Sequence, residues 1–298
     1  MIVLMGATGN TGKVAAEALL SRGEKVRVLG RDAKKLQPFV ARGAEVAAGD
    51  AADPAFLARA FAGADAAYTL IPPDMRAPDF RAHQDRVGEA TVQALRQSGV
   101  KRVVFLSSVG ADLPAGTGPI VGLHAQEERL RGLGVDLLLL RPGYFFENLY
   151  ASLPLIRHQG INGSAIAPEV KLSMIATRDI GAAAAAALAA KDFSGVQVRN
   201  LLGPRDYTMV EVTRILGAKI GKPDLAYVQF PYEAFGAALE QAGLTKDMAR
   251  LYVEMSRAFN AGIVKPVGGR TPESTTPTPF ESFASELAAA YGAGAPKG

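Results

Sequence analysis

The chain has 298 residues, of which 48% are hydrophobic and 21% are charged, and its formal net charge is +4. This composition is ordinary for a globular protein with one large core, alone or with a smaller lobe. The small basic excess argues against nucleic-acid binding. Because cysteine is absent and the three histidines lie far apart in sequence, disulfides, thiolate nucleophiles and a metal site are not expected.

The sequence shows no signal of a membrane or an export pathway. Its longest apolar candidate, residues 180–190, is alanine-rich and too short to cross a bilayer. Met1 leads directly into an apolar run, which leaves no room for a signal peptide. We therefore expect a cytoplasmic protein that makes no use of a membrane.

The start of the chain predicts a strand, a glycine-rich turn and a helix. Residues 2–5 are apolar, the turn has the spacing G-x-x-G-x-x-G, and residues 13–20 follow with helical periodicity. One glycine permits positive φ, a second lets phosphate approach the backbone, and a third lets the helix pack closely. The positive end of the helix then faces the phosphates. The pattern predicts a dinucleotide pyrophosphate site formed by Gly6, Thr8, Gly9, Asn10, Thr11 and Gly12.

The second predicted strand, residues 25–29, is followed by a basic side chain. In a dinucleotide fold this strand end lies beside the adenosine ribose, where an acid binds the 2′-hydroxyl and an arginine accommodates a 2′-phosphate. Arg31 occupies that place and Lys35 lies one helical turn further on. Both favour NADP(H) over NAD(H), with Asp32 as a competing ribose ligand.

The third predicted strand, residues 45–50, ends in Asp50. This strand end faces the adenine in a doubly wound sheet, so Asp50 could accept from the adenine amine, with Ala51 supplying a backbone amide. A helix cap is an equally good interpretation of Asp50.

Two further strands end in residues that suit the other half of a dinucleotide. The strand at 66–71 stops at a proline pair, which opens a loop at the carboxyl edge of the sheet. We therefore expect Leu70, Ile71 and Pro72 to contact the cofactor. The strand at 103–108 ends in Ser107 and Ser108. These hydroxyls could hold the nicotinamide ribose or a substrate carbonyl, or could cap the next turn.

The order of elements predicts an α/β fold. Strands alternate with helices, and the strand at 135–140 is apolar enough to be buried on both faces. We expect a Rossmann-type doubly wound parallel sheet in residues 1–150. Residues 151–298 are expected to form a smaller α+β lobe, with some segments returning to the main sheet.

Several separated motifs together resemble one family, the NmrA-like group of atypical short-chain dehydrogenases. They are the Gly-Ala-Thr-Gly-x-x-Gly turn, Arg31, Ser107-Ser108-Val109-Gly110-Ala111, His124-x-x-Glu127-Glu128, Leu140-Arg141-Pro142-Gly143-x-x-Phe146-Glu147-Asn148, Thr177-Arg178-Asp179-Ile180, and Arg270-Thr271-Pro272 with the segment to Phe283.

This resemblance implies a Rossmann domain, a smaller lobe and a substrate bound between them, with Tyr144 and Asn148 at the nicotinamide. A place in the core of the protein is an equally good interpretation of the Tyr144 ring. The resemblance also implies a helix capped by Asp179. Some members resemble NADPH-dependent quinone or azo reductases, whereas others bind NADP without turnover and regulate a protein partner. A reductase of this kind would act on a small aromatic or quinone-like substrate and would be a monomer or a homodimer.

The sequence departs from typical short-chain dehydrogenases at the proton relay. Residues 108–140 contain neither tyrosine nor lysine, so the usual Tyr-x-x-x-Lys pair is missing. His124 and Tyr144 are the remaining candidates for proton transfer, although His124 also fits a supporting or surface position. A quinone needs less help, because water can protonate the hydroquinone anion.

The C-terminal part is rich in large apolar side chains. Helices are expected at residues 232–242 and 246–260. Their side chains either line an apolar pocket for a flat aromatic substrate or form the core of the small lobe; the residues concerned are Phe230, Tyr232, Phe235, Tyr252, Met255 and Phe259.

Overall fold

The computed structural model describes residues 1–294 and is built around a sheet of seven strands. Every neighbouring pair in this sheet runs parallel, so the predicted Rossmann-type sheet is confirmed. In spatial order the strands are β10 (Val196–Leu201), β6 (Asp136–Pro142), β5 (Arg102–Leu106), β4 (Ala66–Thr69), β1 (Ile2–Leu4), β2 (Val26–Gly30) and β3 (Glu45–Ala48).

The strand order reverses beside β1. From β1 the chain moves outward through β2 and β3, and it then returns to β4 on the opposite side of β1. The connections that follow β1 and β4 therefore lead away from each other at the carboxyl edge. Such a switch point leaves a crevice in which open α/β sheets bind ligands.

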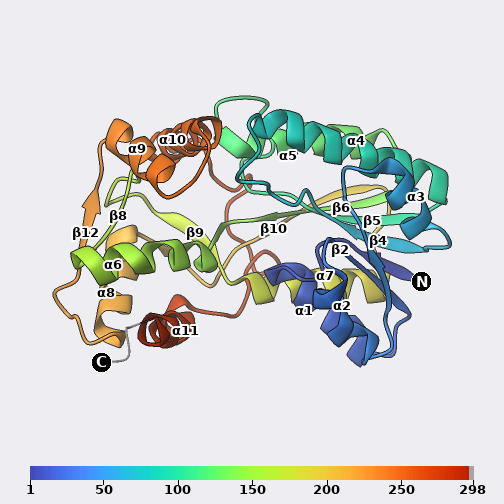
Figure 1. Ribbon diagram of the computed structural model, residues 1–298, viewed down its shortest axis with the longest axis horizontal. Coiled ribbons are helices and arrows are strands. Elements are labelled where there is room, and N and C mark those ends of the chain that lie inside the picture. Colours follow the sequence, from blue (N-terminus) through green and yellow to red (C-terminus); the bar gives the residue numbers. More distant parts are fainter. Residues whose placement is uncertain (295–298) are drawn as a thin grey trace.

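Helices cover both faces of the sheet, as Figure 1 shows. Side chains alternate along β1, so Ile2 and Leu4 pack against one helical layer and Val3 against the other. The first layer contains α1 (Asn10–Ser21), α2 (Ala33–Val40) and α7 (Thr177–Ala190), and the second contains α3 (Pro54–Phe61), α4 (Phe80–Ser98) and α5 (Val121–Arg131).

Strand β6 is apolar because both of its faces are covered. Leu137 and Leu139 lie in one core, Leu138 and Leu140 lie in the other, and all four side chains are fully buried. The sequence-based expectation for this strand is confirmed.

Helix α7 packs tightly against α1, since a Cβ on Gly181 would lie 2.6 Å from the carbonyl oxygen of Thr11. The expectation that Asp179 caps this helix is wrong. The helix begins at Thr177, whose N–H donates to both carboxylate oxygens of Glu147 at 3.0 and 3.1 Å. Asp179 instead accepts from the backbone N–H and the hydroxyl of Thr278. Spacing alone did not reveal this exchange, because Glu147 is distant in sequence.

The remaining elements form a smaller lobe beyond the carboxyl edge (Figure 1). A three-stranded sheet and a two-stranded sheet support it. Its elements are β7 (Tyr144–Phe145), η2 (Phe146–Ser152), α6 (Leu153–Gln159), β8 (Ile161–Ser164), β9 (Leu172–Ile175), β11 (Asp206–Tyr207), α8 (Met209–Lys219), β12 (Ala226–Gln229), α9 (Tyr232–Gln241), α10 (Lys246–Asn260) and α11 (Phe280–Ala293), while the short η1 (Gly118–Ile120) precedes α5.

Aromatic rings form the centre of this lobe. The ring of Phe146 lies 5.2 Å from that of Phe280 and 5.4 Å from that of Phe283, measured between centroids. A capping box begins α8, because the side chains of Thr208 and Glu211 each accept from the other's backbone N–H. Within residues 1–294 no helix has the length and apolar character needed to span a bilayer.

Candidate active site

A cleft of about 870 Å³ follows the carboxyl edge of the sheet. One end is lined by the glycine turn after β1 and by the residues that follow β2, and the other end is lined by the small lobe. The residues after β4, β5 and β6 lie between these ends. The cleft therefore joins the crevice at the switch point to the apolar wall of the second lobe.

Each of the three positions in the turn requires glycine for a different structural reason. Gly6 has φ +66°, a left-handed conformation that side chains rarely adopt. A Cβ on Gly12 would lie 2.3 Å from the carbonyl oxygen of Gly6, so α1 can approach the turn only without a side chain there. Gly9 is extended, and a Cβ on it would meet only the Gly6 carbonyl oxygen, at 3.3 Å. Because Gly9 lines the cleft, a side chain there would occupy ligand space.

The first turn of α1 is open to an anion. Gly9 precedes the helix and has no side chain that could accept from the first N–H groups. These N–H groups and the positive end of the helix suit a pyrophosphate. Thr8, Asn10 and Thr11 line the same part of the cleft.

A buried tyrosine supports this turn from below. The phenol of Tyr68 donates to Thr11 Oγ1 at 2.9 Å, which leaves the Thr11 hydroxyl proton available to a ligand. Tyr68 is fully buried, and this burial raises the pKa of its phenol. The phenol therefore remains a neutral donor at ordinary pH. The sequence did not suggest Tyr68, because it lies in the middle of β4.

At the end of β2 the structure separates two competing side chains. Arg31 lines the cleft, whereas the carboxylate of Asp32 accepts from the backbone N–H of Lys34 at 2.9 Å and caps α2. Asp32 is therefore committed to the helix and Arg31 is the charged group that this part of the cleft presents. Lys35 is exposed on α2 and is not among the lining residues.

Two aspartates follow β3, and the structure shows which of them caps α3. Asp53 caps α3 by accepting from Ala55 N–H at 2.9 Å, so the interpretation of Asp50 as the helix cap is wrong. Asp50 closes the preceding turn by accepting from Ala52 N–H at 3.0 Å. Ala51 lines the cleft and Asp50 does not.

The middle of the cleft is bordered by the ends of β4 and β5. Leu70, Ile71 and Pro72 line it, as does Ser107. The Ser107 hydroxyl donates to Glu127 Oε1 at 2.5 Å, so this serine offers the cleft lone pairs rather than a proton. Such an acceptor suits a ribose hydroxyl better than a carbonyl oxygen.

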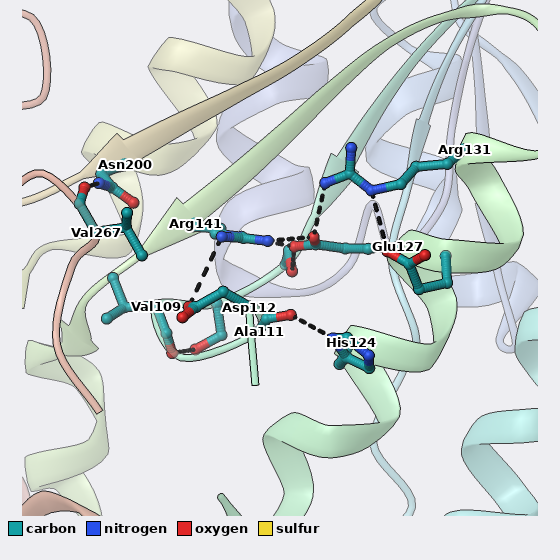
Figure 2. A network of polar contacts seen from close by, with 12 residues as sticks. Val109, Ala111, Asp112, His124, Glu127, Arg131, Arg141, Asn200 and Val267 are labelled. Carbon is teal, nitrogen blue, oxygen red and sulfur yellow. Dashed lines mark hydrogen bonds and ion pairs between the residues drawn. The ribbon is translucent and has the colours of Figure 1, made fainter. Parts of the chain in front are cut away.

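Behind Ser107 lies a buried ion pair between α5 and β6. Arg141 donates from Nε to Glu127 Oε1 at 2.9 Å and from Nη2 to Oε2 at 2.5 Å. Both residues are buried, at 1% exposure for Glu127 and 7% for Arg141. Figure 2 shows Arg141 between Glu127 and Asp112, with Arg131 approaching the far side of Glu127 at 3.6 Å.

Burial opposes the charge of Arg141, but the hydrogen bonds and the charge of Glu127 outweigh it and raise the pKa of the guanidinium. The guanidinium therefore keeps its charge, and the Glu127 carboxylate that it holds accepts from the Ser107 hydroxyl and fixes its position. In the sequence, Glu127 and Arg141 belong to two separate motifs. Their contact depends on how α5 crosses β6, which no local pattern reports.

Of the two candidates for proton transfer, Tyr144 lines the cleft and His124 does not. Tyr144 is half-buried, and burial raises the pKa of its phenol. Its ring packs edge-on against Phe259, with centroids 6.1 Å apart. His124 Nδ1 lies 2.9 Å from the carbonyl oxygen of Ala111, as Figure 2 shows. Because a carbonyl only accepts, this contact places a proton on Nδ1.

The short helix η2 also contributes Asn148, which is exposed and lines the cleft. Its neighbour Glu147 has the structural role at the start of α7 described above. Of the large side chains in the C-terminal part, Tyr252, Met255 and Phe259 line the cleft. Phe230, Tyr232 and Phe235 do not; Tyr232, for example, packs its ring 3.9 Å from the guanidinium of Arg257.

Within residues 1–294 no cluster of three or more histidine, aspartate or glutamate side chains is placed to hold a metal ion. At the end formed by the glycine turn, the donors that the cleft presents are backbone N–H groups, hydroxyls and Arg31, and they fit the pyrophosphate and ribose of a dinucleotide. The other end is an apolar chamber lined by aromatic side chains.

Comparison with known proteins identifies the family. A family model described as the NmrA-like family matches residues 1–283. The chain belongs to this family.

Relatives span nearly the same length as this NmrA-like chain. An NAD(P)H azoreductase from Xenophilus azovorans is 31% identical, with 98% of this chain and 100% of the relative covered. Quinone oxidoreductase 2 from Escherichia coli (strain K12) is 28% identical, with 88% and 89% covered. The crystal structure of an NADPH-dependent quinone oxidoreductase from Escherichia coli with NADPH has a TM-score of 0.77 at 24% identity, covering 96% of this chain and 99% of that one. This likeness in structure extends the agreement in fold to both lobes.

Proposed function

We propose that this NmrA-like protein is an NADPH-dependent reductase of quinone-like or other electron-poor aromatic compounds. The observation that carries the proposal is one continuous cleft, which connects the glycine turn to an aromatic chamber. The names of two relatives, an azoreductase and a quinone oxidoreductase, support the same class of reaction.

The cofactor supplies a hydride when it is bound, and the chain's own residues hold and orient it. The turn from Gly6 to Gly12 and the N–H groups of α1 bind the pyrophosphate. Arg31 binds the 2′-phosphate, and Ala51 borders the adenine with Asp50 behind it. The nicotinamide half is bordered by Leu70, Ile71, Pro72, Ser107, Tyr144 and Asn148.

Residues 1–150 hold the cofactor in this proposal, and residues 151–298 supply the substrate wall. Two segments of the second part, α7 and β10, join the layers of the main sheet and so fix the two parts to each other. Tyr252, Met255 and Phe259 exclude water from the chamber and offer flat apolar surface to an aromatic ring. Rate enhancement arises mainly from proximity and orientation.

The test is steady-state oxidation of NADPH by the purified protein with and without a panel of quinones, alongside direct NADPH binding. Quinone-dependent oxidation is the expected result. NADPH binding without turnover on any quinone would contradict the reductase. It would favour the second candidate, an NADP(H) sensor acting through a protein partner, which the missing Tyr-x-x-x-Lys pair supports.

Replacing Arg31 tests the preference for NADPH. Arg31→Ala is expected to weaken NADPH binding by roughly 10- to 100-fold, because it removes charge-assisted hydrogen bonds to the 2′-phosphate. NADH binding should change less than about twofold, since NADH has no such phosphate. Calorimetric titration of both cofactors measures the difference. Arg96→Ala, which changes an exposed arginine far from the cleft, is the control. Equal losses for NADPH and NADH would contradict the assignment.

Lys35 was predicted to assist Arg31 at the 2′-phosphate. Lys35→Ala in the same titration is expected to have the smaller effect, because Lys35 does not line the cleft. A loss of NADPH affinity as large as that of Arg31→Ala would show that the α2 lysine reaches the phosphate.

Proton transfer is tested with Tyr144→Phe and His124→Gln. We expect kcat for quinones to fall less than about threefold in either variant, because water can protonate a hydroquinone anion. The pKa of Tyr144 is raised by burial, so its phenol stays protonated and should produce no step in kcat between pH 6 and 9. Stopped-flow and steady-state rates across this range measure both effects. A loss above about a hundredfold in one variant would identify that residue as the proton donor.

A further inference from the structure

The chamber end of the cleft carries positive charge that hydride transfer to a neutral quinone does not use. Apart from Arg31, the charged residues that line the cleft are Lys171, Asp206, Lys265 and Arg270. Arg270 is committed within the protein, because it donates to the carbonyl oxygen of Gly203 and forms an ion pair with Asp206. Within residues 1–294 neither lysine has an ion-pair partner, so their two charges remain for a ligand.

Lys171 immediately precedes β9, and the alternation of side chains along this strand sets the face on which the lysine lies. Leu172 and Met174 belong to the core of the small lobe. Ser173 is on the opposite face, and its hydroxyl donates to Asp206 at 2.8 Å. Lys171 lies two residues before Ser173 and shares that face. It therefore borders the cleft from the small lobe.

Lys265 reaches the cleft from the loop between α10 and α11. Its neighbour Val264 is buried in a cluster with Val109 and Ala111, on the loop that follows β5. A Cβ on Gly110 would lie 3.1 Å from Val264 Cγ1, so this segment is seated directly on that loop. Lys265 consequently stands near the carboxyl edge of the main sheet, close to the residues that border the nicotinamide half in the proposed function.

The same cleft is also lined by large apolar and aromatic side chains. Tyr144, Tyr252, Met255 and Phe259 offer surface for a flat ring but no charge for it. A lysine ammonium is a compact charge that binds sulfonate, carboxylate or phosphate oxygens. An aromatic body with one anionic substituent thus matches both parts of this end of the cleft.

We propose that the aromatic acceptor carries an anionic group, which Lys171 and Lys265 bind while its ring lies in the apolar chamber. This inference rests on the proposed function and narrows its substrate class. Both lysines are exposed, so the attraction is moderate and weakens with salt.

The test compares 1,4-naphthoquinone with 1,4-naphthoquinone-2-sulfonate, which share a ring and differ in charge. In Lys171→Gln/Lys265→Gln, kcat/KM for the sulfonate is expected to fall about tenfold, chiefly through KM, as attraction to the charged substituent is lost. The value for the neutral quinone should change less than twofold. Lys101→Gln/Lys219→Gln is the control, because it removes the same charge from exposed residues outside the cleft. The difference between substrates should shrink in 0.5 M NaCl.

The inference is overturned if kcat/KM in the double variant falls equally for the sulfonate and the neutral quinone, or falls for neither. It is also overturned if the double variant loses as much NADPH affinity as Arg31→Ala does. Calorimetric titration with 2-naphthalenesulfonate and 2-naphthol distinguishes failure of the anionic subsite from failure of the reductase, because it measures binding without turnover. If no quinone is reduced but the wild type prefers the sulfonate and the double variant does not, the anionic subsite stands and the reductase fails. If the neutral quinone is reduced but the wild type shows no preference for the sulfonate, the reductase stands and the anionic subsite fails.

Discussion

Gly9→Val is expected to abolish binding of both NADPH and NADH while the protein remains folded. The backbone of Gly9 is extended, with φ −92° and ψ 174°, which valine adopts readily. A Cβ at this position is 3.3 Å from its nearest neighbour, the carbonyl oxygen of Gly6. The valine side chain would enter the cleft where the pyrophosphate must approach the N–H groups of α1. Affinity should fall more than roughly a hundredfold for both cofactors.

Calorimetry measures this affinity, and thermal unfolding without cofactor checks the fold. Gly12→Val is the contrasting variant, because its Cβ would lie 2.3 Å from the Gly6 carbonyl oxygen and must displace the turn itself. It should lower the midpoint of thermal unfolding, whereas Gly9→Val should leave it nearly unchanged. Retained NADPH affinity in Gly9→Val would count against the pyrophosphate turn.

The second large effect is expected from Glu127→Ala. This change leaves the Arg141 guanidinium without its bidentate partner, although Arg141 is only 7% exposed. Removing one partner of a buried pair costs about 3–5 kcal/mol, because the remaining charge is desolvated without compensation. Ser107 also loses the acceptor of its hydroxyl proton. Urea denaturation, read as the free energy of unfolding, measures the loss.

Glu128→Ala is the matched control. Glu128 is the next residue on α5, its side chain is 59% exposed, and its ion pair with Arg131 spans 3.2 Å at the surface. Such pairs contribute less than about 1 kcal/mol. A cost of that size for Glu127→Ala would mean that the buried pair is not needed for stability. Glu127→Leu/Arg141→Met should recover much of the loss, because the double change leaves no charge in the site.

The local patterns of this chain were sufficient for its architecture. Apolar strands alternate with amphipathic helices, and residues 137–140 of β6 are apolar on both faces, which is typical of a covered parallel sheet. The glycine spacing located the turn because φ at Gly6 and the crowding at Gly12 are properties of the backbone near those residues. Short-range physics governs these features.

Choices between neighbouring side chains needed the tertiary structure. Asp32 and Arg31 are adjacent in sequence, and only the start of α2 shows that Asp32 is committed to a cap. At α3 the cap is Asp53, whereas Asp50 closes the preceding turn. An aspartate at either position satisfies the local preference for a cap, so the path of the backbone decides which one caps the helix.

The amino-acid sequence by itself indicated the family, the parallel sheet and the position of the glycine turn, because every motif and periodic pattern behind them is read from a short stretch of the chain. Only the tertiary structure decided that Ser107, Glu127 and Arg141 meet, and that Lys171 and Lys265 border one cleft. It also separated Phe259 in the cleft wall from Phe235 outside it. Contacts between distant segments depend on how helices and strands pack, and that packing minimises buried unpaired charge and exposed apolar surface over the whole molecule at once.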